Sequence, residues 1–339
     1  MNLLIKINEE INRKSWRDFT AAHKNGNIFQ TPEMFDFFSS VRNYQPMAIV
    51  CLGDDEKIHG LLLAVREREH PGFVGRFSSR AIVLGGPLLI ELAAENALAL
   101  ILNAFISKLG KKTIYLELRN LFDFADQAAT FNKYGFTFKE HLNFQVPILA
   151  GADPQKKLSS NRKRQIKKSL ASGASIEEAS TMEQVDEFYN ILSDLYKNKV
   201  RKPLPDHSFF RNFYLAQEKL GVYLLVKFNG KVIGGIMCPV FQDKALYEWY
   251  VCGLDEEYPE QYPSVMATWA AIDYAQKNGI KYFDFLGAGA PDQDYGVREF
   301  KARFGGEMVN YGRFIRINNK ILYGFGKFAL KVLGRIKKI

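Results

Sequence analysis

The chain has 339 residues, 47% of them hydrophobic and 24% charged, and this usage excludes a disordered or fibrous protein. Its length predicts two domains of about 150 residues each, because one hydrophobic core rarely serves a longer chain. The formal net charge of +9 favours phosphate-bearing partners, whether nucleotides, nucleic acid or an anionic membrane surface.

Cysteine and histidine usage argues against metal sites and disulfides. Cys51, Cys238 and Cys252 are scattered, and the five histidines fall at no metal-ligand spacing. We therefore expect no metal and a reducing, cytoplasmic location. The N-terminus turns acidic too early for a signal peptide. The longest uncharged apolar run, residues 81–90, has about half the length needed to span a bilayer, so no membrane span is expected.

The first half of the chain predicts, in order, a hairpin, a strand that ends in glycines, an amphipathic helix and two further strands. These elements are expected at residues 47–52 and 58–65, 81–86, 97–109, 113–118 and 137–147. Gly110 follows the helix and suits a left-handed C-cap.

The second half repeats this order after the turn-rich segment 150–154. Its hairpin, strand, helix and two strands are expected at residues 222–228 and 231–240, 245–253, 265–275, 281–286 and 307–317. Asn229 and Gly230 supply the hairpin turn, and Gly279 supplies the C-cap. The repeat predicts an α/β fold with mixed (α+β) sheets, built from two acyltransferase-type domains over 1–150 and 151–317.

Three stretches, residues 158–168, 282–289 and 295–306, resemble the FemABX-like family, the peptidoglycan-bridge aminoacyltransferases built from tandem GNAT-like domains. The resemblance covers almost the whole chain. It implies transfer of an aminoacyl group from a carrier, often aminoacyl-tRNA, to an amine of a cell-wall precursor. It also implies an acceptor or carrier site at Phe300 and Lys301. The chain departs from the family because no long helical hairpin interrupts the second half, which argues against the family's tRNA-associated arm.

Transfer to an amine requires a stabilised oxyanion and a deprotonated nitrogen. We expect Lys301, with Phe300, to act at the reacting carbonyl, and Arg298 and Arg303 to hold phosphate groups. The alternative is that these three cations form a solvated helix face. Asp284 lies in an apolar strand, where we expect it to orient a loop or a cation. A role for Asp284 as a base is the alternative.

Basic residues dominate the segment 156–168, which holds seven cations and no acid. Such a segment fits a nucleotide-linked or lipid-linked precursor, or RNA, and we assign Arg162 and Arg164 to substrate binding. A plain solvated helix face is the alternative. Lys199 and Arg201 are expected to add to the same anion site.

Aromatic and amide residues complete the predicted binding set. Tyr250 alternates with core residues on its strand and is expected to line the cleft, and Tyr295 opens the last of the three stretches that carry the resemblance. By the resemblance, Gln30 occupies the place where the first domain receives part of the precursor.

No cofactor is expected, because the donor, aminoacyl-tRNA or acyl-CoA, is a substrate. GNAT enzymes carry a glycine-containing loop where a helix begins, but the corresponding residues 261–266 lack glycine, which argues against ordinary acetyl-CoA chemistry; Ser264 remains able to cap that helix. Three functions stay open: a Fem-like transferase, an acyl-CoA-dependent N-acyltransferase, and a non-catalytic binder of RNA or anionic lipid.

The C-terminal residues 318–339 predict an amphipathic basic helix. Two interpretations stay open for it. The helix either lies on an anionic membrane, which would give peripheral contact with the inner face of the cytoplasmic membrane, or packs on the first domain. The oligomeric state is not predicted.

Overall fold

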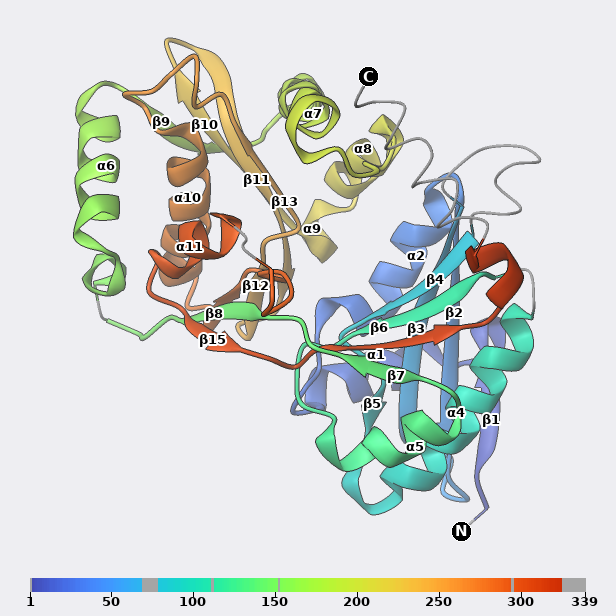
Figure 1. The fold of residues 1–339 in the computed structure, drawn as a ribbon. Coiled ribbons are helices and arrows are strands. Elements are labelled where there is room, and N and C mark those ends of the chain that lie inside the picture. The colour runs from blue at the N-terminus through green and yellow to red at the C-terminus, as the bar shows by residue number, and fades with distance from the viewer. Residues whose placement is uncertain (1, 69–78, 111–112, 152, 294–295, 325–339) are drawn as a thin grey trace. The chain divides into compact units, whose positions relative to one another are not determined.

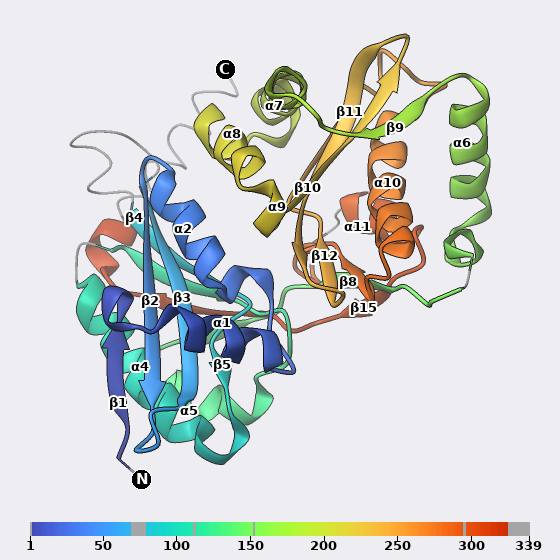
Figure 2. The same ribbon diagram turned by 180° about the vertical axis from the view of Figure 1, so that it is seen from behind.

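The computed structural model describes residues 2–68, 79–110, 113–151, 153–293 and 296–324. The chain forms two compact units (Figures 1 and 2). Unit 1 comprises Met1–Glu140 together with Tyr311–Ile339, and unit 2 comprises His141–Asn310. The polypeptide therefore passes from unit 1 to unit 2 and then returns.

These boundaries correct the predicted ones at residues 150/151 and 317/318. Each of the two strands predicted to end a domain is divided between the units. Residues 137–147 form β7 (Thr137–Lys139) in the sheet of unit 1 and β8 (Asn143–Pro147) in the sheet of unit 2. Residues 307–317 form β15 (Glu307–Val309) in unit 2 and β16 (Arg313–Ile317) in unit 1.

Gly312 permits the chain to pass from β15 in unit 2 to β16 in unit 1. Gly312 has a φ of +63°, and a Cβ at this position would lie 2.3 Å from the ring of Phe138. Both the left-handed backbone and the close ring exclude a larger residue. The sequence pattern, which alternates through 307–317, does not reveal this break.

Unit 1 is a mixed sheet with the strand order β1-β2-β3-β4-β6-β16-β7, in which β5 pairs with β3. Among the strands of unit 1 that the structure describes, only β4 and β6 run parallel. The remaining strands are β1 (Leu4–Ile7), β2 (Tyr44–Leu52), β3 (Ile58–Arg68), β4 (Ser79–Leu84), β5 (Leu88–Leu89) and β6 (Tyr115–Arg119). The α-helices are α1 (Arg13–Ala22), α2 (Pro32–Ser40), α4 (Ala94–Leu109) and α5 (Ala128–Lys133), with 3-10 turns at Asn8–Glu10, Ile28–Gln30, Glu91–Ala93 and Ala125–Gln127.

Helix α4 packs on β2 and β3 and supplies the centre of the unit 1 core. Its buried face consists of Ala97, Leu98, Ile101, Leu102 and Phe105, all without exposed surface. Among the described residues, Glu91–Leu109 is the one helical segment long and apolar enough to cross a membrane. A core helix passes the same test of length and composition, and the burial of α4 against the sheet accounts for its apolar face.

Unit 2 repeats the plan with the strand order β15-β8-β14-β12-β11-β10-β9, and β13 pairs with β11. Again one pair, β12 and β14, runs parallel. Its other strands are β9 (Ser175–Glu178), β10 (Gly221–Phe228), β11 (Lys231–Phe241), β12 (Ala245–Tyr247), β13 (Tyr250–Gly253) and β14 (Tyr282–Asp284). The α-helices are α6 (Ser160–Ala171), α7 (Met182–Leu195), α8 (His207–Leu215), α9 (Gln217–Leu220), α10 (Pro263–Lys277) and α11 (Gly296–Ala302), with a 3-10 turn at Pro154–Lys157 and a π-helical turn at Tyr196–Val200.

The C-terminal helix expected over 318–339 falls largely outside the described residues. Residues 320–324 are helical, and residues 325–339 are not described. Its packing and its membrane contact both remain predictions.

Candidate active site

The parallel strands of unit 2 separate at their carboxyl ends and create the candidate site. The register pairs Tyr247 with Asp284 and ends there. Glu248 N still donates to Asp284 O at 2.8 Å, whereas Trp249 N donates to Met237 O at 3.1 Å, so the chain changes partner strand between these two residues. The single strand predicted over 245–253 is thus two strands, β12 and β13, and Glu248 lies at the break between them.

Lys301 projects from α11 into this break and is buried, with 7% of its surface exposed. Its Nζ atom lies 2.9 Å from Glu248 Oε1, 2.9 Å from Phe285 O and 2.8 Å from Gly287 O. Three hydrogens meet three acceptors, so no donor remains for a substrate carbonyl in this conformation. The alternative of a solvated helix face is wrong for Lys301, and the predicted fixed charge is present but directed at the protein itself.

Asp284 is fully buried at the end of β14. Its carboxylate accepts hydrogen bonds from Asn143 Nδ2 at 2.8 Å, Gln145 Nε2 at 2.9 Å and Leu286 N at 2.7 Å. Burial raises the pKa of Asp284, although these hydrogen bonds act in the opposite direction. The contacts are those expected of a residue that orients a loop, since they tie β14 to β8 and to the turn at Leu286.

Glu248 is the site residue that sequence reasoning missed. Burial raises the pKa of its carboxyl, and Lys301 opposes that change. Its second oxygen, Oε2, is buried and has no hydrogen-bond partner among the described residues. The signal that selected Asp284, a single acid inside an apolar strand, was also present at Glu248, between Tyr247 and Trp249.

Arg298 fixes the loop that follows β14. Its guanidinium donates to Ala288 O at 3.1 Å, to Pro291 O at 3.4 Å and to Ala290 O. Carbonyl oxygens of the loop thus engage each of its three nitrogens, and the predicted role of Arg298 in holding a substrate phosphate remains a prediction. Gly287 N also donates to Asn143 Oδ1 at 2.8 Å, so both sides of the loop are held.

An internal carboxylate occupies the N-terminus of α10. Ser264 N and Ser264 Oγ donate to the two carboxylate oxygens of Asp255 at 3.1 and 2.5 Å. The N-cap residue itself is Tyr262, with a φ of +45°, rather than Ser264. The helix end where GNAT enzymes are expected to hold a pyrophosphate therefore already carries a negative charge.

The basic segment 156–168 contains a buried arginine as well as exposed cations. Arg162 is 4% exposed, and its guanidinium lies over the rings of Phe300 at 4.4 Å and Phe304 at 5.1 Å. Arg164 is exposed and donates to Asn161 Oδ1 at 3.0 Å. Arg303 is exposed at the end of α11. The structure thus brings Arg162, Phe300 and Arg303 together and leaves Arg164 on the surface.

The remaining candidates of unit 2 lie apart from this cluster. Lys199 pairs with Glu256 at 2.5 Å, and Arg201 is exposed where the π-helical turn ends in a left-handed residue. Tyr250 is half-buried and packs against Phe209 and Phe210 with ring centroids 6.0 and 5.1 Å away. Tyr295 lies outside the described residues.

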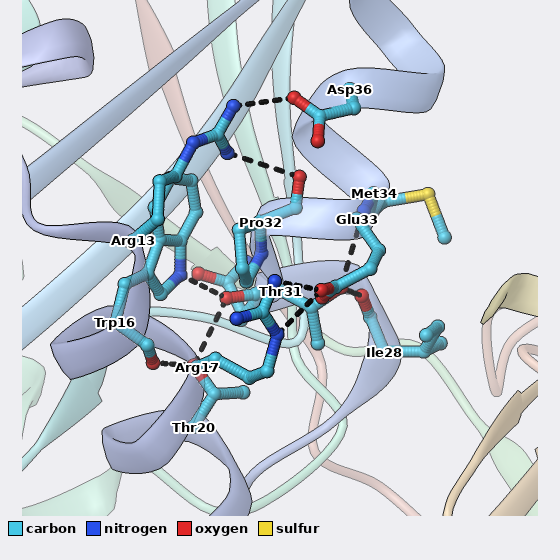
Figure 3. A network of polar contacts seen from close by, with 11 residues as sticks. Arg13, Trp16, Arg17, Thr20, Ile28, Thr31, Pro32, Glu33, Met34 and Asp36 are labelled. Carbon is cyan, nitrogen blue, oxygen red and sulfur yellow. Dashed lines mark hydrogen bonds and ion pairs between the residues drawn. The ribbon is translucent and has the colours of Figure 1, made fainter.

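Gln30 belongs to the core of unit 1 rather than to a binding surface. It has no exposed surface, and its side-chain amide bonds Leu63 N at 2.7 Å, Leu63 O at 3.2 Å and Leu84 O at 2.9 Å. Its backbone carbonyl accepts from Trp16 Nε1 at 2.7 Å. Trp16 belongs to the polar network of Figure 3. The expected substrate role of Gln30 is corrected, because every polar group of the side chain is used within the protein.

The same network joins α1 to α2 through charged side chains. Figure 3 shows Arg17 directed at Glu33 and Arg13 directed at Asp36 and the Pro32 carbonyl. These contacts hold the first turn of α2. Within the ranges that the structure describes, no group of three or more His, Cys, Asp or Glu side chains is arranged to hold a metal ion.

Residues 156–301 match the family model of the acetyltransferase (GNAT) domain. Unit 2 therefore carries an acyltransferase domain. The sequence matches no curated protein.

Several solved structures share the fold of the whole chain. FemX superposes with a TM-score of 0.71 at 16% identity, covering 96% of this chain and 99% of FemX. A tandem GNAT protein from the clavulanic acid biosynthesis pathway gives 0.60 at 11% identity, covering 94% and 99%. The C-terminal domain of a putative lysylphosphatidylglycerol synthetase from Agrobacterium fabrum gives 0.56 at 10% identity, covering 94% and 96%. The predicted tandem GNAT-like fold is confirmed, and the resemblance to the FemABX-like family holds at the level of the fold.

Proposed function

We propose that this protein transfers an aminoacyl or acyl group to an amine of a phosphate-bearing cell-envelope precursor. The observation that carries the proposal is the separation of β12 and β14, with the buried Glu248, Asp284 and Lys301 at the break. A GNAT-type domain match and the tandem fold shared with FemX support the same reaction class.

The chemistry assigns a role to each of these groups. The acceptor nitrogen attacks the acyl carbonyl, a C–N bond forms, and the bond to the carrier oxygen or sulfur breaks. Glu248 accepts the proton lost by the nitrogen through Oε2, since Oε1 is engaged by Lys301. That proton then passes to the departing carrier. Burial, which raises the pKa of Glu248, makes it a stronger base near neutral pH.

The test is product formation from purified protein. Nucleotide-linked and lipid-linked muropeptides would each be combined with charged tRNA or acyl-CoA, and products identified by mass spectrometry. We expect Glu248→Gln, which preserves size and an acceptor for Lys301, to lower kcat by about 10²- to 10⁴-fold. Glu177→Gln, which removes an exposed acid paired with Lys227, is the matched control and should leave kcat unchanged. An absence of product from every combination would contradict the proposal.

The identity of the donor distinguishes the Fem-like transferase, the leading candidate, from an acyl-CoA-dependent N-acyltransferase, the second candidate. The GNAT match favours acyl-CoA as a second candidate donor, whereas the Asp255 carboxylate at the N-terminus of α10 disfavours a pyrophosphate there. We expect charged tRNA, and not acyl-CoA, to raise the melting temperature. Steeply salt-dependent RNA or lipid binding with no product would instead support the non-catalytic binder. Contact of residues 318–339 with an anionic membrane belongs to the same proposal and is tested by vesicle sedimentation.

A further inference from the structure

Arg162 is a buried cation that forms no ion pair within the described part of the chain, although Asp255 acts on it from a longer distance. Its Nη1 atom donates to Gln165 Oε1 at 2.7 Å, and its Nε atom is buried with no hydrogen-bond partner. The rings of Phe300 and Phe304 stack on its guanidinium. A buried guanidinium needs either an anion or a full set of acceptors, and the protein supplies neither.

Arg303 adds positive charge near Arg162, and Asp255 offsets only part of it. Burial and repulsion from Arg303 together lower the pKa of Arg162 to about 10, although attraction to Asp255 acts in the opposite direction. Arg303 itself is half-exposed, and the nearest oxygen of Glu299 lies 3.9 Å away, which is a weak pairing. Lys156 and Lys157 are exposed just before the first turn of α6. This arrangement favours the binding of an anion.

The position of this cluster connects it to the candidate active site. Ser159 N donates to Arg303 O at 3.0 Å, so the start of α6 lies against the end of α11. Phe300, over which Arg162 stacks, immediately precedes Lys301 on α11. An anion held by Arg162 and Arg303 would therefore lie beside α11, the short helix that delivers Lys301 to the break between β12 and β13.

We propose that Arg162 and Arg303 bind a phosphate group of the donor substrate beside Phe300. The assignment to the donor rests on the proposed function, whereas the anion site itself rests on the buried guanidinium. The shared chemistry is a phosphate ester, supplied either by the 3′ end of an RNA carrier or by coenzyme A. The phosphate would complete the hydrogen bonding of Arg162 and neutralise its repulsion with Arg303.

Binding measurements on the full chain test this site. A labelled single-stranded RNA ending in CCA would be titrated by fluorescence anisotropy and coenzyme A by calorimetry, at one fixed low salt concentration, with inorganic phosphate as competitor. We expect either the RNA or coenzyme A to bind, and we expect inorganic phosphate to compete with the ligand that binds. Arg162→Met and Arg303→Met should each weaken binding by about tenfold or more, since each removes charge-assisted hydrogen bonds.

Arg164→Met is the matched control. It removes one positive charge from the same helix but leaves the Phe300 cluster intact, so we expect less than about a twofold change in Kd. Equal losses in Arg164→Met and Arg162→Met would overturn the proposal in favour of diffuse attraction by a basic helix. Unchanged binding in Arg162→Met and Arg303→Met, or no binding of any probe to the unaltered protein, would overturn it as well.

Folding is monitored by the melting temperature without ligand. A purely structural Arg162 would make Arg162→Met less stable, whereas a site lacking its anion should make the variant equally stable or more stable. If Arg162→Met does not fold, the exposed Arg303→Met decides the question. Binding that depends on Arg162, with no transfer product from any donor, would refute the proposed function and leave the anion site standing. Transfer with an unaltered donor KM in both variants would refute the site alone.

Discussion

At the scale of single residues, the buried pair of Lys301 and Glu248 governs what the candidate site tolerates. The exposed fractions of the two side chains are 9% and 5%, so water cannot replace either partner. Removing one member of such a pair leaves the other charge buried and unpaired. Substitution of Lys301 is therefore expected to lower the stability of unit 2 as well as transfer activity.

We expect Lys301→Met to destabilise unit 2 by about 3–5 kcal/mol, because the buried Glu248 carboxylate loses its charged partner. Urea unfolding followed by tryptophan fluorescence measures this loss. Lys277→Met is the control, since Lys277 is exposed and pairs with Asp273 one helical turn away, and should cost no more than about 0.5 kcal/mol. The double variant Lys301→Met with Glu248→Gln should recover part of the lost stability. Equal stability of Lys301→Met and the unaltered protein would show that Glu248 does not depend on Lys301.

Sequence reasoning located these charged residues but not their partners. A lone acid or cation in an apolar run indicates burial, and this signal selected Asp284 and Lys301. Their partners Asn143, Gln145 and Glu248 lie on strands remote in sequence, and a single sequence does not show which strand will adjoin. Gln30 was misassigned for the same reason, because its three acceptors and donors come from strands that fold over it.

At the scale of elements, one buried acid joins two neighbouring strands of unit 1 that lie far apart in the sequence. Glu117 on β6 lies 2.7 Å from Arg313 on β16 and 3.2 Å from Arg119. Burial alone would raise the pKa of Glu117, but the two guanidiniums outweigh burial and lower it to about 2. A carboxyl whose folded pKa is depressed stabilises the protein above its ordinary pKa of 4.5, and this stabilisation is lost as the pH falls toward 2.

We expect the stability difference between the unaltered protein and Glu117→Gln to be largest above pH 4.5 and to shrink as the pH approaches 2. Its pH-dependent part corresponds to roughly 3 kcal/mol. Thermal unfolding of both proteins across this range measures it. Glu91→Gln, whose exposed carboxylate pairs with Lys24, should leave the profile nearly unchanged. A difference that does not vary with pH would mean that Glu117 is not held ionised by the two arginines.

Most elements could be predicted because their signals are local. The hairpin turn at Asn229 and Gly230 has the expected positive φ values of 50° and 78°, and Gly110 and Gly279 end their helices at +57° and +67°. The strand breaks could not be predicted. One lies at Glu248, and the others lie where the chain passes between the units, within residues 137–147 and 307–317. There the alternation of side chains continues while the hydrogen-bonding partner changes, and partner exchange leaves no local pattern.

At the scale of the whole molecule, the points at which the chain passes between the units decide which fragments can fold. Unit 2 is one continuous stretch, His141–Asn310, and includes both β8 and β15. The domain predicted from sequence, 151–317, lacks β8. Without β8, β14 loses one of its two neighbours and Asp284 loses Asn143 and Gln145.

We expect the fragment 141–310 to show near-ultraviolet circular dichroism and a cooperative thermal transition. The fragment 151–317 should show neither, because a buried carboxylate and two strand edges are left without partners. Circular dichroism and size-exclusion chromatography of the two purified fragments check this. Equal folding of both would show that β8 is dispensable to the sheet.

The return of β16 to the first sheet also sets an order of events during synthesis. The ribosome releases the segment 141–310 as an uninterrupted whole, and that segment can close its sheet as soon as it emerges. The earlier-made portion must wait for residues 313–317 before its sheet is complete. The N-terminal part of this nascent chain therefore finishes last, the reverse of the usual succession along a polypeptide.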